Sequence, residues 1–171
     1  MLEIPNGINV DVKDNLITVS GSLGKNKRIY NDKLMEVSVK GNQIHIECTK
    51  NKKLAKVANN TVNTLLKELK NDMDGVNKHF EIKMLAVFAH FPITIEVKNN
   101  IVIIKNILGA RAAMYTDIVG DTKIDVNGQN VRIYGINKED VSQTAANIRM
   151  ACKVRKRDER VFQDGVYYAI E

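Results

Sequence analysis

The chain has 171 residues, of which 44% are apolar and 27% charged, and its formal net charge is +6. This composition excludes a disordered chain, because so many apolar residues can form hydrophobic cores. Domains commonly have roughly 50 to 200 residues, so the length fits one large domain or two small ones.

The class of protein is narrowed further by its cysteines and its apolar runs. Cys48 and Cys152 have no CxxC partner, so we expect no disulfide framework and an intracellular protein. Apolar runs such as Met84 to Phe91 are far shorter than the ~20 residues that span a bilayer. We therefore expect no membrane span and no cleaved leader. The positive net charge suggests an anionic partner.

An internal repeat organises the chain. The segment from Gly7 to Gly24, GINVDVKDNLITVSGSLG, aligns without a gap with PITIEVKNNIVIIKNILG, Pro92 to Gly109, at an offset of 85 residues. The repeat resumes with residues 37–47 against 124–134, now at an offset of 87, as a loop insertion would produce. A period near 85 is too long for a solenoid and indicates two compact domains in tandem.

Each resumed segment is predicted to be a β-hairpin with a glycine at its turn, at Gly41 and Gly128. Alternating apolar residues place one face of each hairpin inward: Val37, Val39, Ile44 and Ile46 in the first copy, and Ile124, Val126, Val131 and Ile133 in the second.

A helix is predicted after each hairpin. The first covers residues 52–70, with Leu54, Val57, Ala58, Thr61, Leu65, Leu66 and Leu69 at three- and four-residue spacing. The second is capped by Asn137 and runs from Lys138 to about Val154, with Val141, Ala145, Ile148 and Cys152 inward.

The sequence therefore predicts an α+β protein of two tandem related domains, residues 1–82 and 83–171. Each is a small antiparallel sheet set packed on one α-helix. The joint near Val76 to Lys83 contains no Gly/Ser or Pro-rich spacer, so we expect a short, rather stiff connection.

Positive charge is concentrated between Arg149 and Arg160, where six residues are basic and two acidic. The cluster begins on the second helix and is predicted to continue into an extended segment, Arg155 to Val161, at the edge of the domain. Such an array can bind a phosphate backbone. The alternative is a solvated helix face with small ion pairs to Asp158 and Glu159.

Other motifs give weaker signals. GSLG, Gly21 to Gly24, has the GxxG spacing of an RNA-binding module but follows a strand, so a hairpin loop is favoured. Lys25, Lys27 and Arg28 beside it could still touch phosphate.

Residues 70–81 resemble a calcium loop, but Lys70 stands where a carboxylate is needed, so a helix end closed by Gly75 is favoured. No histidine has metal-ligand spacing with another His or Cys. We expect no cofactor and no metal. One functional alternative is an enzyme that uses Asp72, Asp74 and Glu81 with a metal.

Three stretches carry a resemblance to a known family: KMLAVFAHFPITIEV (residues 83–97), NILG (106–109) and RDERVFQDGVYY (157–168). Together with the repeat, they resemble the large-subunit ribosomal protein six family in its archaeal and eukaryotic form. The resemblance implies two related α/β domains and a non-enzymatic structural role in the large ribosomal subunit, in a single copy per ribosome.

The resemblance also implies partners. The protein would bind large-subunit ribosomal RNA near the sarcin-ricin loop and the stalk base. Neighbouring large-subunit and stalk-base ribosomal proteins, and the docking site of translation GTPases, would be close by. The rival from another class is a duplicated protein–protein interaction module that binds an acidic partner.

By the same resemblance the second domain carries most of the RNA contact. The predicted RNA-binding residues are Lys153, Arg155, Lys156, Arg157, Arg160 and Arg149, with Lys25, Lys27 and Arg28 in the first domain. The family's loop after its NFLG motif is basic, whereas here ILGARAAMYTDI offers only Arg111. Phe162 and Tyr167 would anchor the tail, Asp164 and Gly165 would form a turn between them, and the cations would face RNA.

Overall fold

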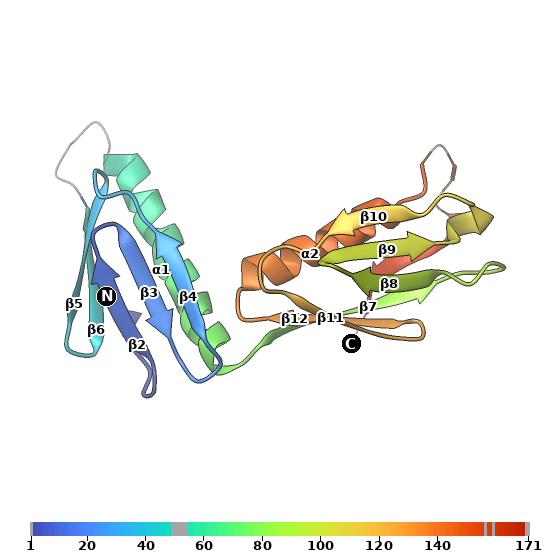
Figure 1. The fold of residues 1–171 in the computed structure, drawn as a ribbon. Coiled ribbons are helices and arrows are strands. Elements are labelled where there is room, and N and C mark those ends of the chain that lie inside the picture. Colours follow the sequence, from blue (N-terminus) through green and yellow to red (C-terminus); the bar gives the residue numbers. More distant parts are fainter. Residues whose placement is uncertain (1, 49–54, 156, 159, 170–171) are drawn as a thin grey trace. The chain divides into compact units, whose positions relative to one another are not determined.

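The computed structural model describes residues 2–48, 55–155, 157–158 and 160–169 (Figure 1). The chain divides into two compact units, Met1–His79 and Phe80–Glu171. Both units are α+β, with small antiparallel sheets and one α-helix each, as predicted. The expected division between residues 82 and 83 lies inside strand β7 (Phe80–Val87).

The first unit has two three-stranded antiparallel sheets and helix α1 (Ala55–Asn77). One sheet has the order β2-β3-β4: β2 (Asn9–Lys13), β3 (Leu16–Ser20) and β4 (Lys25–Ile29). The other has the order β1-β6-β5: β1 (Leu2–Glu3), β5 (Met35–Lys40) and β6 (Gln43–Cys48). Helix α1 packs against β3, β4 and β6, so the core lies between the helix and both sheets.

Helix α1 ends seven residues later than the predicted end at Lys70, and Gly75 is a buried residue within it rather than its closing residue. The apolar stripe continues through Met73 and Val76, which are 2% and 0% exposed. The last turn is also held by the GSLG loop, because the Leu23 N–H donates to the Val76 carbonyl at 3.0 Å. A Cβ on Gly21 would lie only 2.7 Å from Val76 Cγ2, so this loop approaches the helix closely.

The second unit is built on the same plan. Its three-stranded sheet has the order β10-β9-β8: β8 (Thr94–Lys98), β9 (Ile101–Lys105) and β10 (Met114–Asp117). Its four-stranded sheet has the order β11-β12-β7-β13: β11 (Lys123–Asn127), β12 (Asn130–Gly135), β7 and β13 (Gly165–Tyr168). Helix α2 (Lys138–Cys152) packs against β7, β10, β12 and β13.

The predicted repeat is confirmed strand by strand. Strands β2 and β3 coincide with β8 and β9 at the offset of 85, and β6 coincides with β12 at the offset of 87. The hairpin glycines Gly41 and Gly128 both have positive φ, 61° and 60°. The predicted insertion lies between β9 and β10, where eight residues replace the four between β3 and β4.

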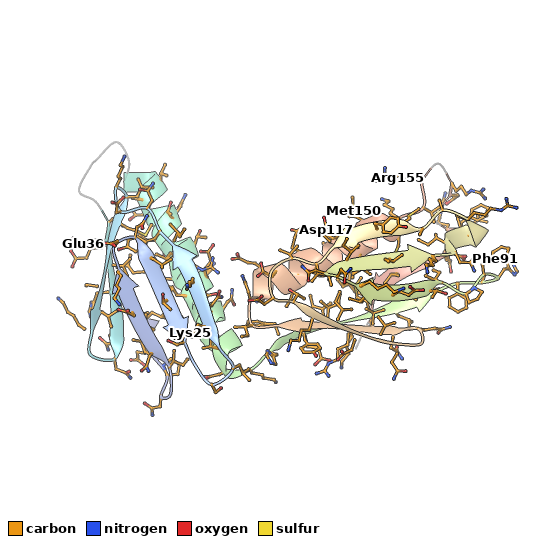
Figure 2. All side chains as sticks on the ribbon, viewed as in Figure 1. Lys25, Glu36, Phe91, Asp117, Met150 and Arg155 are labelled. Atoms are coloured by element: carbon orange, nitrogen blue, oxygen red, sulfur yellow. The ribbon has the colours of Figure 1, made fainter. Side chains whose placement is uncertain are left out.

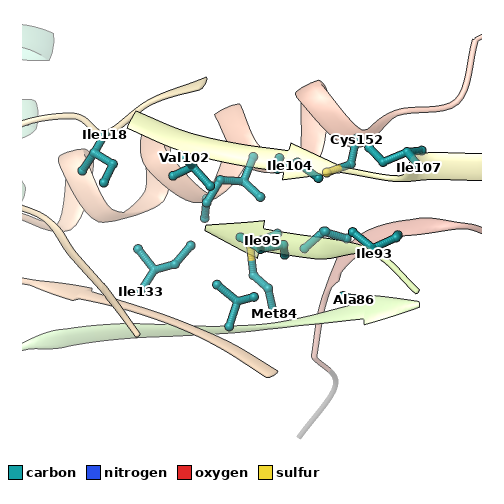
Figure 3. Packing of buried hydrophobic residues seen from close by; sticks show 14 of the residues in the cluster. Met84, Ala86, Ile93, Ile95, Val102, Ile104, Ile107, Ile118, Ile133 and Cys152 are labelled. Carbon is teal, nitrogen blue, oxygen red and sulfur yellow. The ribbon is translucent and has the colours of Figure 1, made fainter. Parts of the chain in front are cut away.

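The core of the second unit lies between α2 and the sheets (Figure 3). Val102, Ile104, Ile133 and Ile148 are fully buried in it. The predicted inward face of α2 is confirmed, since Val141, Ala145, Ile148 and Cys152 are all buried. The Asn137 cap is also confirmed: its side chain accepts a hydrogen bond from the Glu139 N–H at 3.0 Å. The helix ends at Cys152, two residues before the predicted end.

Among the helices that the structure describes, none is both long and apolar enough to span a bilayer.

Candidate nucleic-acid interface

Three sequence motifs meet at one end of the second unit. Phe91 of AHFPI packs on Gly109 of NILG so closely that a Cβ on Gly109 would lie 3.1 Å from Phe91 Cε2. Asn106 Nδ2 donates to the Pro92 carbonyl at 3.1 Å. The Ala89 N–H donates to Asp164 Oδ1 of the C-terminal motif at 3.3 Å. Segments up to 75 residues apart therefore form one structural site.

The NILG loop has a strained backbone. Asn106, Leu108 and Gly109 have φ values of 66°, 50° and 73°, all in the left-handed region. For a non-glycine residue such as Leu108 this conformation costs about 1–2 kcal/mol, and such strain persists only where the surroundings hold it. The 3₁₀ turn η1 (Ile107–Gly109) is closed by the Ala110 N–H, which donates to the Ile107 carbonyl at 3.0 Å. The loop thereby presents Ala110 and Arg111 at the surface.

A turn begins at Asp158, so the predicted extended segment from Arg155 to Val161 is wrong in its C-terminal part. The N–H groups of Val161 and Phe162 both donate to the Asp158 carbonyl, at 3.1 and 3.0 Å. The backbone N–H and side chain of Arg160 also bond the Asp158 carboxylate, and these contacts lower the pKa of that carboxyl. The Arg160–Asp158 ion pair is exposed and adds little stability.

The predicted anchoring role is wrong for Tyr167, whose side chain is exposed, whereas Phe162 is half-buried and the orientation of the cations towards RNA stays a prediction. Cations and aromatics pair: Arg157 lies over the Phe162 ring at 4.8 Å from the centroid, and Arg149 lies over Tyr168 at 5.5 Å. Tyr167 is 38% exposed. The buried residues of the tail are instead Asp164, Gly165 and Val166, because β13 adds to the edge of β7 and buries its own start. Asp164 and Gly165 form no turn, since Gly165 is already the first strand residue.

The tail cations lie beside the NILG loop. Lys153, Arg155 and Arg157 are exposed and line one side of an open hollow of about 590 Å³. Leu108 and Ala110 line it from the loop, and Figure 2 shows Arg155 and Met150 in this part of the unit. Arg149 and Arg160 are exposed as well. Lys156 lies outside the described residues.

The predicted RNA-binding cations of the first unit lie on opposite faces of strand β4. Lys25 and Lys27 are exposed on β4, whereas Arg28 points inward, with a side chain only 15% exposed. Its Nε and Nη2 donate to the two oxygens of Asp72 at 2.8 and 3.1 Å, and its Nη1 lies 3.0 Å from Glu68 Oε2. The Arg28 guanidinium is therefore bound inside the first unit by a bidentate ion pair. The period-2 pattern of KNKRI gave no signal for this inward orientation, because Ile29, its apolar residue, lies on the face of Lys25 and Lys27 and is 73% exposed.

Two of the three acidic residues of the enzyme alternative are paired with other side chains. Asp72 is held by Arg28 and Asn26, and Glu81 accepts from Arg132 Nη2 at 2.8 Å. In the part of the chain that the structure describes, no group of three or more His, Cys, Asp or Glu residues could hold a metal ion.

Sequence analysis missed a second hollow, of about 330 Å³, between the C-terminal end of α2 and β13. Its lining includes Arg149, Lys153, Phe162 and Tyr168. Only the pairing of β13 with β7 brings these residues together, so spacing along the chain held no signal for it.

Comparison with known proteins bears on this site. The family model described as ribosomal protein L6 matches residues 91–165, which include NILG and most of the AHFPI and C-terminal motifs. A large ribosomal subunit protein uL6 from Methanocella arvoryzae is 43% identical over 167 residues, covering 97% of this chain and 93% of the relative. The chain belongs to the uL6 family.

Further uL6 relatives support the assignment. The protein from Methanobrevibacter smithii is 39% identical over 166 residues, covering 97% of this chain and 92% of its own. The protein from Methanosarcina mazei is 36% identical over 166 residues, covering 97% and 93%. The resemblance to this family in its archaeal form is thus confirmed, and the uL6 matches extend over both units.

Proposed function

We propose that this protein is a structural constituent of the large ribosomal subunit and binds large-subunit ribosomal RNA through its second unit. The proposal rests on membership of the uL6 family, whose curated relatives are named as large-subunit proteins. The observation that carries the RNA contact is the convergence of Lys153, Arg155 and Arg157 with the NILG loop at one end of the unit. The protein would act in the cytoplasm, as part of a ribonucleoprotein and not as an enzyme.

The chemistry of the contact is phosphate binding. Arginine donors form bidentate hydrogen bonds with phosphate, and each neutralised phosphate releases counterions. Arg149, Arg155, Arg157 and Arg160 supply guanidinium groups around the end of α2, Arg111 supplies another from the loop, and Lys153 adds a point charge. The strained NILG loop gives the surface a fixed shape, so the protein would brace folded RNA helices.

The site on the RNA is proposed from the family resemblance alone. It is the region near the sarcin-ricin loop and the base of the stalk, beside neighbouring ribosomal proteins and the docking site of translation GTPases, with one protein copy per ribosome. Lys25 and Lys27 are the first-unit cations that we include as a secondary contact. Arg28 is left out, because its donors bind Asp72 and Glu68.

Crosslinking the tagged protein in its own cells and sequencing the attached RNA tests the proposal. The unchanged protein should recover large-subunit ribosomal RNA near the sarcin-ricin loop. A variant with Lys153, Arg155 and Arg157 changed to Ala should lose it. The matched control changes Lys98, Lys105 and Lys123, three exposed cations on other strands of the same unit, to Ala and should retain the RNA.

Two other results would contradict the proposal in different ways. Ribosomal RNA retained by the tail variant would move the contact surface elsewhere. Recovery of no RNA would favour the duplicated protein–protein interaction module with an acidic partner. The exposed apolar side chains of Met150 and Val161, 59% and 72% exposed, beside the cations would suit such a partner.

A further inference from the structure

We propose that the hollow between α2 and β13 takes an unstacked nucleobase of the bound RNA, with the neighbouring phosphate on Arg149 and Lys153. This inference rests on the proposed RNA-binding function and adds to it a base-binding site. The hollow of about 330 Å³ is at the lower end of the roughly 300–1,000 Å³ typical of small-molecule sites.

The floor of the hollow is apolar and uncharged. Cys152 and Val166 line it and are 2% and 1% exposed. Burial raises the pKa of the Cys152 thiol to about 12, so the thiol stays protonated at neutral pH. Phe162 and Tyr168 add aromatic side chains to the lining. Flat, apolar surroundings of this kind suit a base that has left its stack.

The rim of the hollow is cationic. Arg149 and Lys153 both line it, and the guanidinium of Arg149 is held 5.5 Å from the centroid of the Tyr168 ring. Among the described residues that line the hollow, none is acidic. An aromatic side chain beside a fixed cation matches the two parts of a nucleotide, its base and its phosphate.

The hollow adjoins the phosphate-binding surface. It shares Met150, Lys153 and Val154 with the hollow of about 590 Å³ that Arg155 and Arg157 line. A backbone bound along Arg157, Arg155 and Lys153 would therefore pass its opening. This continuity of positive charge favours an RNA base over an apolar side chain of a protein partner.

The test compares three RNA probes on the full chain: a single-stranded hexaadenylate, the same ribose-phosphate chain without bases, and a fully paired hairpin. Tyr168→Leu should weaken binding of hexaadenylate by about 5- to 150-fold, as loss of one base–aromatic contact does. Tyr168→Phe should retain binding. The chain without bases should bind more weakly than hexaadenylate, and Tyr168→Leu should not change its affinity.

The matched control is Tyr115→Leu. Tyr115 is 66% exposed on β10 and lies outside the lining of the hollow, so its loss should leave hexaadenylate binding unchanged. NMR on the unchanged protein gives a second measurement that needs no variant. The methyl resonances of Val166 should shift with hexaadenylate and not with the chain without bases.

The outcomes separate this inference from the proposed function. If Tyr168→Leu binds hexaadenylate as tightly as Tyr115→Leu and the Val166 resonances do not move, the base site is overturned. Binding of the paired hairpin would then leave the proposed function standing. If the unchanged protein binds none of the three probes, both proposals fail.

Discussion

At the residue scale, ion pairs with a buried side chain affect stability more than exposed charges do. Arg28 is surrounded by Asp72 and Glu68, and Asp72 has a side chain only 3% exposed. Removing one partner of a buried pair leaves an uncompensated charge, which is more costly than losing an exposed pair. The cations of the tail are exposed, so their removal should change binding and leave stability almost unchanged.

The first prediction concerns this buried pair. Asp72→Asn should lower the free energy of unfolding of the first unit by about 3 kcal/mol, because the Arg28 guanidinium loses its bidentate partner. Chemical denaturation followed by circular dichroism measures the change. Asp11→Asn is the matched control: Asp11 pairs with Lys13 at 3.0 Å, but its side chain is 61% exposed. Equal effects of the two substitutions would show that burial of the pair does not matter.

The second prediction concerns pH. Hydrogen bonds from Lys105 and then Lys98 lower the pKa of the Glu96 carboxyl from its ordinary 4.5 to about 2. Because the folded pKa is depressed, the contribution of Glu96 to stability is present above pH 4.5 and is lost as pH falls towards 2. Carbon-13 NMR titration of the carboxyl should give this low value, and Lys105→Met should raise it. An ordinary pKa in the unchanged protein would contradict the pairing.

At the element scale, the second copy of the repeat differs from the first in two additions. The β9–β10 connection is longer, and β13 extends the sheet of β7. Both additions lie at the end of the unit where AHFPI, NILG and the tail motif meet, and both line the hollows beside the cations. The duplicated scaffold is therefore common to both units, whereas the candidate interface combines the C-terminal end of α2 with the two additions.

The third prediction tests the contact between two of these motifs. Gly109→Ala should destabilise the second unit by about 1–2 kcal/mol through its φ of 73°, and further through contact with Phe91. Gly128→Ala measures the backbone cost alone, since Gly128 has a φ of 60° but no atom lies within 4 Å of an added Cβ. In thermal unfolding, the midpoint temperature of Gly109→Ala should be lower than that of Gly128→Ala. Equal effects would mean that Phe91 moves away at no cost.

At the scale of the whole molecule, charge is distributed unequally for a chain of +6. Of the residues from 86 onward, those outside the Arg149–Arg160 segment are net negative. An anionic partner should therefore be attracted to one end of the second unit. The first unit is also net positive, but Arg28 points inward, so its charge is not available at the surface of that unit to bind an anionic partner.

The fourth prediction follows from this distribution. The slope of the logarithm of RNA affinity against the logarithm of salt concentration changes by roughly 0.7 to 0.9 for each phosphate contact. Changing Lys153, Arg155 and Arg157 to Ala should make the slope shallower by about two units. The Lys98, Lys105 and Lys123 variant carries the same charge change and should keep the original slope. Equal slopes for both variants would indicate attraction by net charge alone.

Local pattern and repetition were enough to predict much of the fold. Alternating apolar residues specify the buried face of the first hairpin, and the offsets of 85 and 87 locate matching strands. In the second hairpin the predicted inward face is confirmed at Val131 and Ile133 but wrong at Val126, which is 37% exposed on the edge strand β11. The Asn137 cap and the inward face of α2 were also readable, because helix ends and faces depend on residues within a few positions. The family was recognisable from three short motifs and the repeat.

Tertiary structure alone decided the form of the candidate site. Val76 extends α1 because a distant loop packs on it, and Asp72 takes Arg28 inward although 44 residues separate them. The addition of β13 to β7 brings Tyr168 to Arg149 and joins the tail to Ala89. Sequence by itself determined the two helices, the hairpins of the repeat and the inward face of α2, since periodicity is local. Which cations stay at the surface, and which aromatics lie beside them, depends on contacts between distant segments.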